Sequence, residues 1–318
     1  MNTFKWLLKR EFWEHKGAFF WAPVAVAGIM TLFIAVSLAI ALAGVSDGLK
    51  VNGMDISELS RALTPEQTTA FAAQFVLGYA GITMPIFLVL AIGVFFFCLG
   101  ALYDERRDRS VLFWKSLPLS DHATVLSKVV IAIGVAPVIA MVIATATAAL
   151  VALLVGIAAL VLGINLFGAL LTNWDFYLAP IQMTAILPVY AMWALPTIGW
   201  LLMVSAWARG KPLLWAVGVP VMSGILFSWA QRMFAFDWNT GWYWKNIVGR
   251  LLGSVMPGGW LSDNRQMSAG EHNSMTALGD VLNQSWQLFG GANIWLGAAA
   301  GALMIYAAIR LRGWRDEG

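Results

Sequence analysis

The stretch VAVAGIMTLFIAVSLAIALAGV, from Val24 to Val45, contains no Asp, Glu, Lys, Arg or His. A second uncharged stretch, FAAQFVLGYAGITMPIFLVLAIGVFFFCLGALY, runs from Phe71 to Tyr103. A helix of ~20 apolar residues crosses the ~30 Å hydrocarbon core of a bilayer, so each stretch is long enough to span it. The strands of a membrane barrel alternate apolar and polar residues over ~10 positions, and neither stretch does. Both stretches therefore predict transmembrane helices.

The composition extends this prediction to the whole chain. Of its 318 residues, 60% are hydrophobic and only 12% are charged. A soluble domain carries about 25% charged residues, because water must solvate its surface, so lipid must be part of the solvent here. We expect an all-α polytopic membrane protein with a single transmembrane domain over residues 1–318. Its six predicted spans cover roughly 22–44, 72–102, 126–163, 178–207, 212–231 and 289–309.

The apolar stretch from Leu126 to Leu171 is compatible with one long helix or with two short ones. The number of spans decides which side each later loop occupies, so the basic residues, which favour the cytoplasmic side, can arbitrate. One span with the N-terminus inside places most of the 20 Lys and Arg residues inside. These are Lys5, Lys9, Arg10, Lys16, Arg106, Arg107, Arg109, Lys115, Lys128, Arg209, Lys211, Arg310, Arg312 and Arg315. Two spans would put the basic C-terminal tail outside, so we predict one span and cytoplasmic termini.

Two segments outside the spans have a distinctive composition. Residues 1–20 carry Phe4, Leu7, Leu8 and Phe12 on one side of a helix, with Lys5, Lys9 and Lys16 on a neighbouring face. This pattern predicts an interfacial helix on the inner leaflet, and a basic flank that only fixes orientation is the alternative. Residues 232–288 form an outer loop rich in Trp, a residue that favours the headgroup level. We expect short interfacial helices there, and a binding platform for an exported molecule is the alternative.

The sequence lacks the motifs of the common catalytic and metal sites. It contains no GxxxxGK[ST] loop for nucleotide phosphates, no HExxH or GxSxG motif, and no paired Cys/His spacing. The one cysteine, Cys98, lies in a predicted span, where a small apolar core residue is its simplest role. We therefore expect no enzymatic activity, cofactor or metal in this chain. Energy for any uphill transport would have to come from a partner.

The loop between the second and third spans combines charges with aromatic residues. It begins Tyr103-Asp104-Glu105-Arg106-Arg107-Asp108-Arg109-Ser110 and continues Val111-Leu112-Phe113-Trp114-Lys115. Opposite charges three and four residues apart support a short exposed helix. Charges that steer encounter, together with an aromatic anchor, are what a docking element for a soluble protein needs. A connector that merely obeys the positive-inside rule is the alternative.

The same loop carries a resemblance to a known family. Glu105, Arg109, Ser110 and Val111 are followed by Ser116-Leu117-Pro118-Leu119-Ser120 and then by Leu126-Ser127-Lys128. This pattern resembles the membrane-spanning permeases of the type-two ABC exporters. The layout is similar too, with a basic N-terminal helix, six spans and a long outer loop before the last span. One departure is Arg109, where many members carry Gly.

The resemblance implies a permease that forms a homodimer and binds two ATP-binding cassette ATPase subunits. ATP and Mg would be bound by those partners, and substrate would move as the ATPase dimer closes. The loop would be the coupling element, with docking residues Asp104, Glu105, Arg106, Arg107, Asp108, Arg109, Phe113, Trp114 and Lys115. The implied location is the bacterial cytoplasmic (inner) membrane, in contact with lipid and with no nucleic-acid partner.

A different class of function remains open from the sequence. A membrane-embedded scaffold or assembly factor would share the composition but would translocate nothing. For an exporter, the uncharged spans favour an apolar or amphipathic substrate. Gly297 and Gly301 form a GxxxG pattern in the last span, which allows close helix packing. The pattern predicts a tight contact either between two subunits or within one.

Overall fold

The computed structural model describes residues 3–46, 50–51, 54–55, 65–108, 120–234, 239–261 and 278–315. These residues are helical apart from turns and one short hairpin, β1 (Lys50–Val51) with β2 (Met54–Asp55). Six helices are long and apolar enough to cross a membrane: Gly17–Gly44, Glu66–Arg107, Asp121–Val161, Trp174–Trp207, Pro212–Phe234 and Ala292–Trp314. The prediction of a helical chain with six helices long and apolar enough to span a membrane is confirmed.

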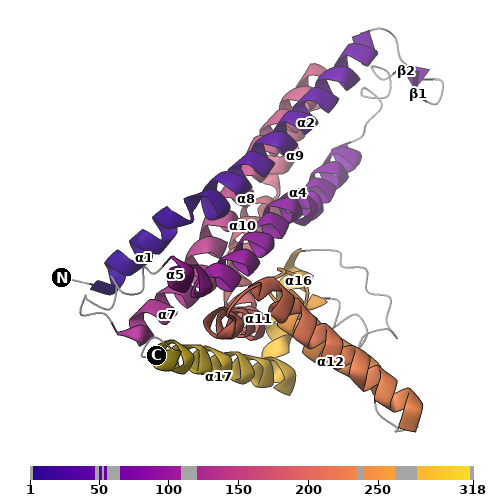
Figure 1. The fold of residues 1–318 in the computed structure, drawn as a ribbon. Coiled ribbons are helices and arrows are strands. Elements are labelled where there is room, and N and C mark those ends of the chain that lie inside the picture. Colours follow the sequence, from indigo (N-terminus) through magenta and orange to yellow (C-terminus); the bar gives the residue numbers. More distant parts are fainter. Residues whose placement is uncertain are drawn as a thin grey trace.

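The elements follow one another as a helical chain (Figure 1). In order they are α1 (Thr3–Glu14), η1 (Gly17–Trp21), α2 (Ala22–Ser46), α4 (Pro65–Gly100), α5 (Tyr103–Arg107), α7 (Asp121–Val130), η2 (Ile131–Val135), α8 (Ala136–Val161), α9 (Leu166–Thr172), α10 (Trp174–Ala185), α11 (Leu187–Trp207), α12 (Pro212–Phe234), α13 (Thr240–Tyr243), η3 (Trp244–Val248), α14 (Gly249–Gly253), α16 (Leu278–Gln287), η4 (Leu288–Gly290) and α17 (Ala292–Arg315).

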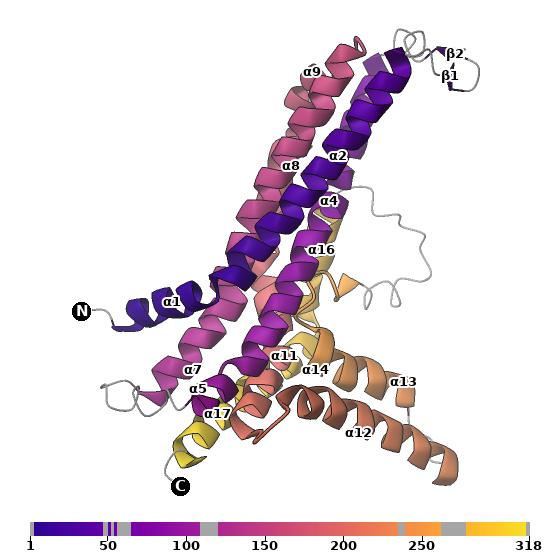
Figure 2. The ribbon, with the colours of Figure 1, turned by 45° about the horizontal axis from the view of Figure 1, so that its top comes forward.

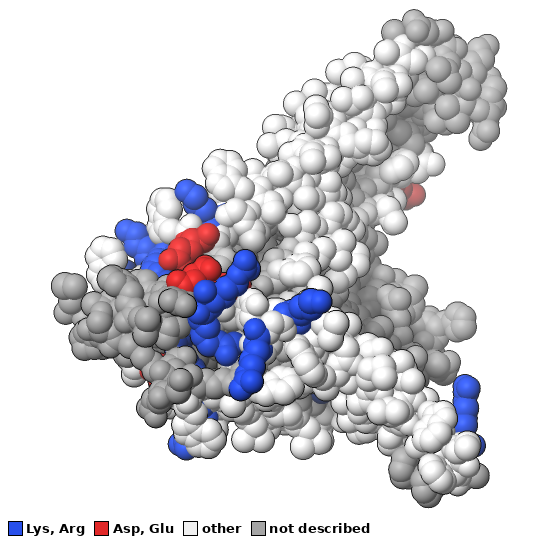
Figure 3. Space-filling model, in the orientation of Figure 1, with Lys and Arg blue, Asp and Glu red and all other residues white. Residues whose placement is uncertain are grey.

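Helices α2, α4 and α8 run side by side as a long shaft (Figures 1 and 2). Near one end of the shaft lie α5, α7, α11 and α17, and both chain termini are at this end. Helix α12 diverges from the shaft. Charged residues gather around α1 and α5 on the face drawn in Figure 3, whereas the far part of the shaft is almost without them there. The charged end and the uncharged shaft match what water and hydrocarbon respectively require.

The stretch from Leu126 to Leu171 contains one long helix rather than two antiparallel ones. Elements α7, η2 and α8 continue into one another from Asp121 to Val161. The helix then ends in a Schellman motif, in which the Gly163 N–H donates to Leu160 O and the Ile164 N–H donates to Ala159 O, both at 2.9 Å. Gly163 has φ +82°, a left-handed conformation that favours glycine. The chain then turns back, and α9 packs against α4.

The backbones of α11 and α17 approach each other closely. A Cβ atom added at Gly199 of α11 would meet the backbone oxygen of Gly301 on α17, and one added at Gly301 would lie 2.5 Å from the carbonyl carbon and oxygen of Leu195. Glycine at both positions lets the two backbones touch. Of the two alternatives for the GxxxG pattern, the described residues therefore show packing within one subunit.

The outer loop does not lie wholly on a surface. Trp244 donates its indole N–H to the Ser228 hydroxyl of α12 at 3.0 Å, and its ring covers Gly224. Trp260 is only 2% exposed and donates to the Ser285 hydroxyl at 2.9 Å. Serine hydroxyls of the same chain therefore satisfy the N–H groups of these two residues, and the placement of this loop at the membrane surface stays a prediction.

Trp242 and Trp286 are exposed, and Trp238 lies outside the described residues. The buried Arg250 of α14 connects the same loop to two spans. Its guanidinium carbon stacks 4.4 Å from the Trp193 ring centre on α11, and its Nη1 donates to Asn293 O on α17 at 2.6 Å. The described residues of this segment, 239–261 and 278–288, are thus packed against the helical body.

Candidate functional site

The five-residue helix α5 is attached to the end of α11. Its first backbone groups, the N–H of Leu102 and of Tyr103, both donate to the Ser205 hydroxyl at 3.0 Å. A helix N-terminus leaves such N–H groups unpaired within the helix, so Ser205 acts as a cap from a distant part of the chain. Arg106 donates to the Ser205 carbonyl and, at 3.1 Å, to Ala208 O. The loop after the second span is therefore fixed to the fourth span at its start.

Glu105 faces into the protein from α5 and pairs with two cations. Its Oε1 lies 2.9 Å from Lys128 Nζ of α7, and its Oε2 accepts from Arg312 Nη1 of α17 at 2.7 Å. The Glu105 side chain is buried. Removing a carboxylate from water costs several kcal/mol, and two close cations offset that cost. Glu105 thus joins the third span and the last span to α5.

Lys128 and Arg312 each hold a second carboxylate. Lys128 Nζ lies 3.0 and 2.9 Å from the two carboxylate oxygens of Glu11 on α1, and Arg312 Nε donates to Asp121 Oδ1 at 3.0 Å. Glu11 is 0% exposed and Lys128 is 2% exposed. Glu11, Glu105, Asp121, Lys128 and Arg312 together form what we call the ion-pair cluster. It ties α1, α5, α7 and α17 to one another.

The predicted docking residues divide into three groups. Asp104, Arg107 and Asp108 are exposed at the surface of the loop. Arg106 is half-buried against α11, and Glu105 points inward. Arg109, Phe113, Trp114 and Lys115 lie outside the described residues. The sequence-based expectation that Glu105 belongs to an exposed docking helix differs from the structure, because two buried cations draw its carboxylate into the protein.

Glu11, Arg312 and Asp121 were not predicted as site residues. Only Glu105 and Lys128 belong to the sequence pattern described above, and the structure pairs them although 22 residues separate them. Glu11 follows Leu7 by one helical turn, on the side of α1 that also carries Leu8. An acidic residue on the apolar side of a predicted helix was the available signal, because a buried charge needs a partner.

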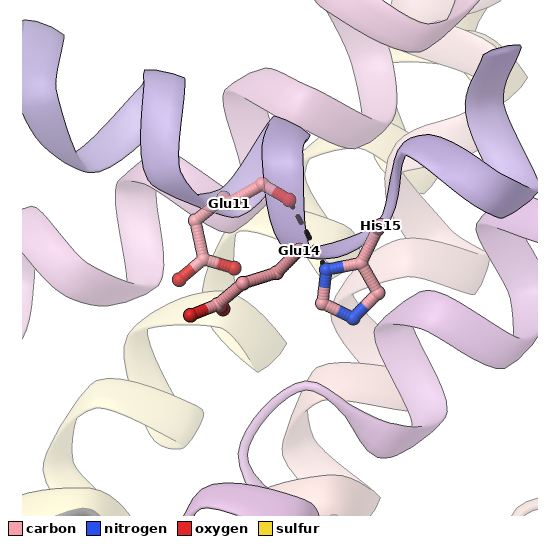
Figure 4. Close-up of side chains that lie close together, drawn as sticks. All are labelled: Glu11, Glu14 and His15. Atoms are coloured by element: carbon pink, nitrogen blue, oxygen red, sulfur yellow. Dashed lines mark hydrogen bonds between the residues drawn. The ribbon is translucent and has the colours of Figure 1, made fainter.

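Glu11 and Glu14 of α1 lie close to His15, which directly follows the helix (Figure 4). Each of the three side chains offers an atom that could bind a metal ion, and these three atoms lie within 4.8 Å of one another. Lysine and arginine already neutralise both carboxylates, since Glu11 pairs with Lys128 and Glu14 with Arg10 at 2.8 Å. The His15 Nδ1 lies 3.1 Å from the Glu11 carbonyl oxygen, and its ring packs 4.7 Å from Phe97. These contacts support a structural role rather than a metal site.

Comparison with known proteins does not identify the chain. No protein-family model matches it, and neither a curated protein nor a solved structure gives a match. The functional interpretation therefore rests on the sequence pattern around Glu105 and on the geometry of the ion-pair cluster.

Proposed function

We propose that this chain is the membrane-spanning permease subunit of an ATP-driven exporter, acting as a dimer with a separate ATP-binding cassette ATPase. The observation that carries the proposal is the pairing of Glu105 with Lys128, 2.9 Å apart. These are two charged positions of the pattern that resembles the type-two exporters. Their ion pair links the loop to the third span, which supports a coupling function for the residues of this pattern.

The contacts of α5 suggest how a force on the loop reaches the membrane. Glu105 holds Lys128 of the third span and Arg312 of the last span. Arg106 holds the end of α11, in the fourth span. A displacement of α5 by a bound ATPase would therefore pull on three spans at once. Packed helices respond to such a displacement by moving as rigid bodies, which is what alternating access requires.

The two sides of α5 then have different tasks. Asp104, Arg107 and Asp108 face outward and contact the ATPase, together with residues of 109–115. Glu105 and Arg106 transmit the displacement without touching the partner. The charged end of the molecule is cytoplasmic, α1 lies on the inner leaflet, and the membrane is a bacterial cytoplasmic membrane. The substrate is apolar or amphipathic, because the spans are almost free of charge.

The orientation gives the first testable expectation. Single cysteines replace Ser46, Ser116, Ser268 and Gly318 in a Cys98→Ala background, and intact cells are treated with an impermeant thiol reagent. Ser46→Cys and Ser268→Cys should be labelled, since the basic residues place both segments outside. Ser116→Cys and Gly318→Cys should react only after the membrane is opened. Labelling of Gly318→Cys from outside would reverse the orientation of the last span.

Docking of the ATPase is tested at Trp114, the proposed aromatic anchor of the loop. Trp114→Ala should weaken binding of the cognate ATPase roughly 30-fold, since truncating an aromatic anchor costs ~2 kcal/mol or more. Lys115→Ala, next to it, is the control and should cost at most ~1 kcal/mol as a rim charge. Affinity is measured on detergent-purified protein with an ATP-binding cassette ATPase of the same organism.

Both variants must insert into membranes as the unsubstituted chain does, so that the affinities compare folded proteins. If Trp114→Ala keeps full ATPase affinity and full export, the loop is a connector and the coupling assignment fails. An ATPase that never binds the unsubstituted chain would instead favour the scaffold function.

A further inference from the structure

Helix α1 has two faces of opposite character. The inner face carries Leu7, 5% exposed, and Glu11, 0% exposed, which is held by Lys128. On the other face the indoles of Trp6 and Trp13 are 59% and 56% exposed. Lys5 and Lys9 are exposed there as well, and Lys16, which follows the end of the helix, is also exposed. At 3.6 residues per turn, Lys5, Trp6, Lys9 and Trp13 fall within an arc of about 100°.

The lysines and tryptophans of this face are neighbours in space. Lys9 Nζ lies 5.2 Å from the Trp6 ring centre, and Lys16 Nζ lies 5.1 Å from the Trp13 ring centre. The two acidic residues of α1 contribute little negative charge here, because Glu11 pairs with Lys128 and Glu14 with Arg10. The outward face of α1 is therefore positively charged and carries indole rings.

We propose that the outward face of α1, formed by Lys5, Trp6, Lys9 and Trp13, binds the headgroups of anionic phospholipids together with Lys16 just beyond the helix end. Lysine ammonium groups attract the phosphates of an anionic leaflet. Indole rings settle at headgroup level, where the ring meets apolar atoms and the N–H meets polar ones. Charge and ring chemistry thus fit the same ligand.

The course of the chain favours a lipid over a soluble protein as the ligand. Helix α1 leads through η1 directly into the first span, and it leaves the axis of α2 at an angle (Figure 2). Phe20 and Trp21, at the start of that span, are 40% and 58% exposed. The exposed aromatic residues of α1 therefore continue into those of a membrane-crossing helix. Lipid binding at this site does not require an ATPase, so it can be tested independently of the proposed function.

The test places a fluorescent probe beside this face in the full-length protein. A Cβ atom at Gly17 would meet nothing within 4 Å, and Cys98 is completely buried, so Gly17→Cys can be labelled selectively. The labelled protein is reconstituted into phosphatidylcholine vesicles with increasing spin-labelled phosphatidylglycerol or spin-labelled phosphatidylcholine. We expect half-maximal quenching at an about fivefold lower fraction of the phosphatidylglycerol, which is the equivalent of one lysine contact.

Matched substitutions assign the selectivity to α1. The triple variant Lys5→Gln, Lys9→Gln and Lys16→Gln should lose the preference, whereas the triple Lys→Arg variant should keep it. Arg209, Lys211 and Arg310 are exposed and belong to the same predicted cytoplasmic side. Replacing these three by Gln removes the same charge and should leave the preference unchanged.

Three results would overturn the proposal. The first is equal quenching by both lipids in the unsubstituted protein. The second is an equal loss in the control triple variant, because a general charge effect would then explain the selectivity. The third is an α1 triple variant that keeps its lipid preference but no longer binds the ATPase, since the face would then serve a protein partner.

Discussion

Lys128→Met is expected to lower the free energy of unfolding by about 3–5 kcal/mol, the range measured when one partner of a buried ion pair is removed. Lys128 contacts both Glu11 and Glu105 at 2.9 Å, and methionine fills a similar volume without a charge. Two buried carboxylates would then have lost a cation. Denaturant unfolding of the purified protein in detergent measures the change. Lys9→Met, the same substitution at an exposed position, should change stability by less than about 0.5 kcal/mol.

A rescue experiment separates lost charge from lost packing. If unpaired carboxylates cause the damage, adding Glu11→Gln and Glu105→Gln to Lys128→Met should restore a large part of the stability, because amides are far less costly to bury than carboxylates. If packing causes it, the added substitutions should make no difference or lower stability further. A Lys128→Met protein as stable as the parent would contradict the burial of the cluster.

Because Glu105 belongs to the ion-pair cluster, a substitution there can affect protein stability as well as ATPase affinity. As an exposed docking residue, Glu105 would affect ATPase affinity alone. As a buried member of the ion-pair cluster, it holds Lys128 and Arg312, and its loss should destabilise the protein as well. A weaker ATPase interaction of Glu105→Ala is therefore not evidence for docking unless stability is measured beside it.

The sequence was sufficient for the spans because each depends on local information. A run such as Val24–Val45 shows its length and its lack of charge directly, and hydrocarbon imposes both. The ion-pair cluster depends instead on tertiary structure. Glu11 and Lys128 are 117 positions apart, and Glu105 and Arg312 are 207 apart. No rule of spacing connects such pairs, so the sequence does not reveal which residue Glu11 pairs with.

The outer loop shows a second limit of the sequence. Its tryptophans were expected at headgroup level because an indole N–H needs a polar partner. That requirement holds, but Ser228 and Ser285 of the same chain meet it for Trp244 and Trp260. Chemistry alone specifies that a partner exists, whereas the path of the chain after α12 decides whether that partner is water, lipid or a serine.

The glycine contact between α11 and α17 gives the last prediction. Gly301→Ala should destabilise the protein by about 3 kcal/mol, the upper end of the usual cost of overpacking. The new methyl group would lie 2.5 Å from the Leu195 carbonyl atoms and 2.8 Å from Pro196 N. Backbone atoms cannot rotate away as a side chain does, so the two helices would have to separate. Unfolding in detergent measures the loss.

Gly218→Ala on α12 is the matched control, because a Cβ atom there would meet nothing within 4 Å. Alanine is favoured over glycine in a helix by up to ~1 kcal/mol, so this variant should be as stable as the parent or more so. The same chemical change would then have opposite signs on two helices. If Gly301→Ala instead keeps its stability but no longer forms a dimer, the GxxxG pattern lies between subunits, and the packing of α17 on α11 does not account for these glycines.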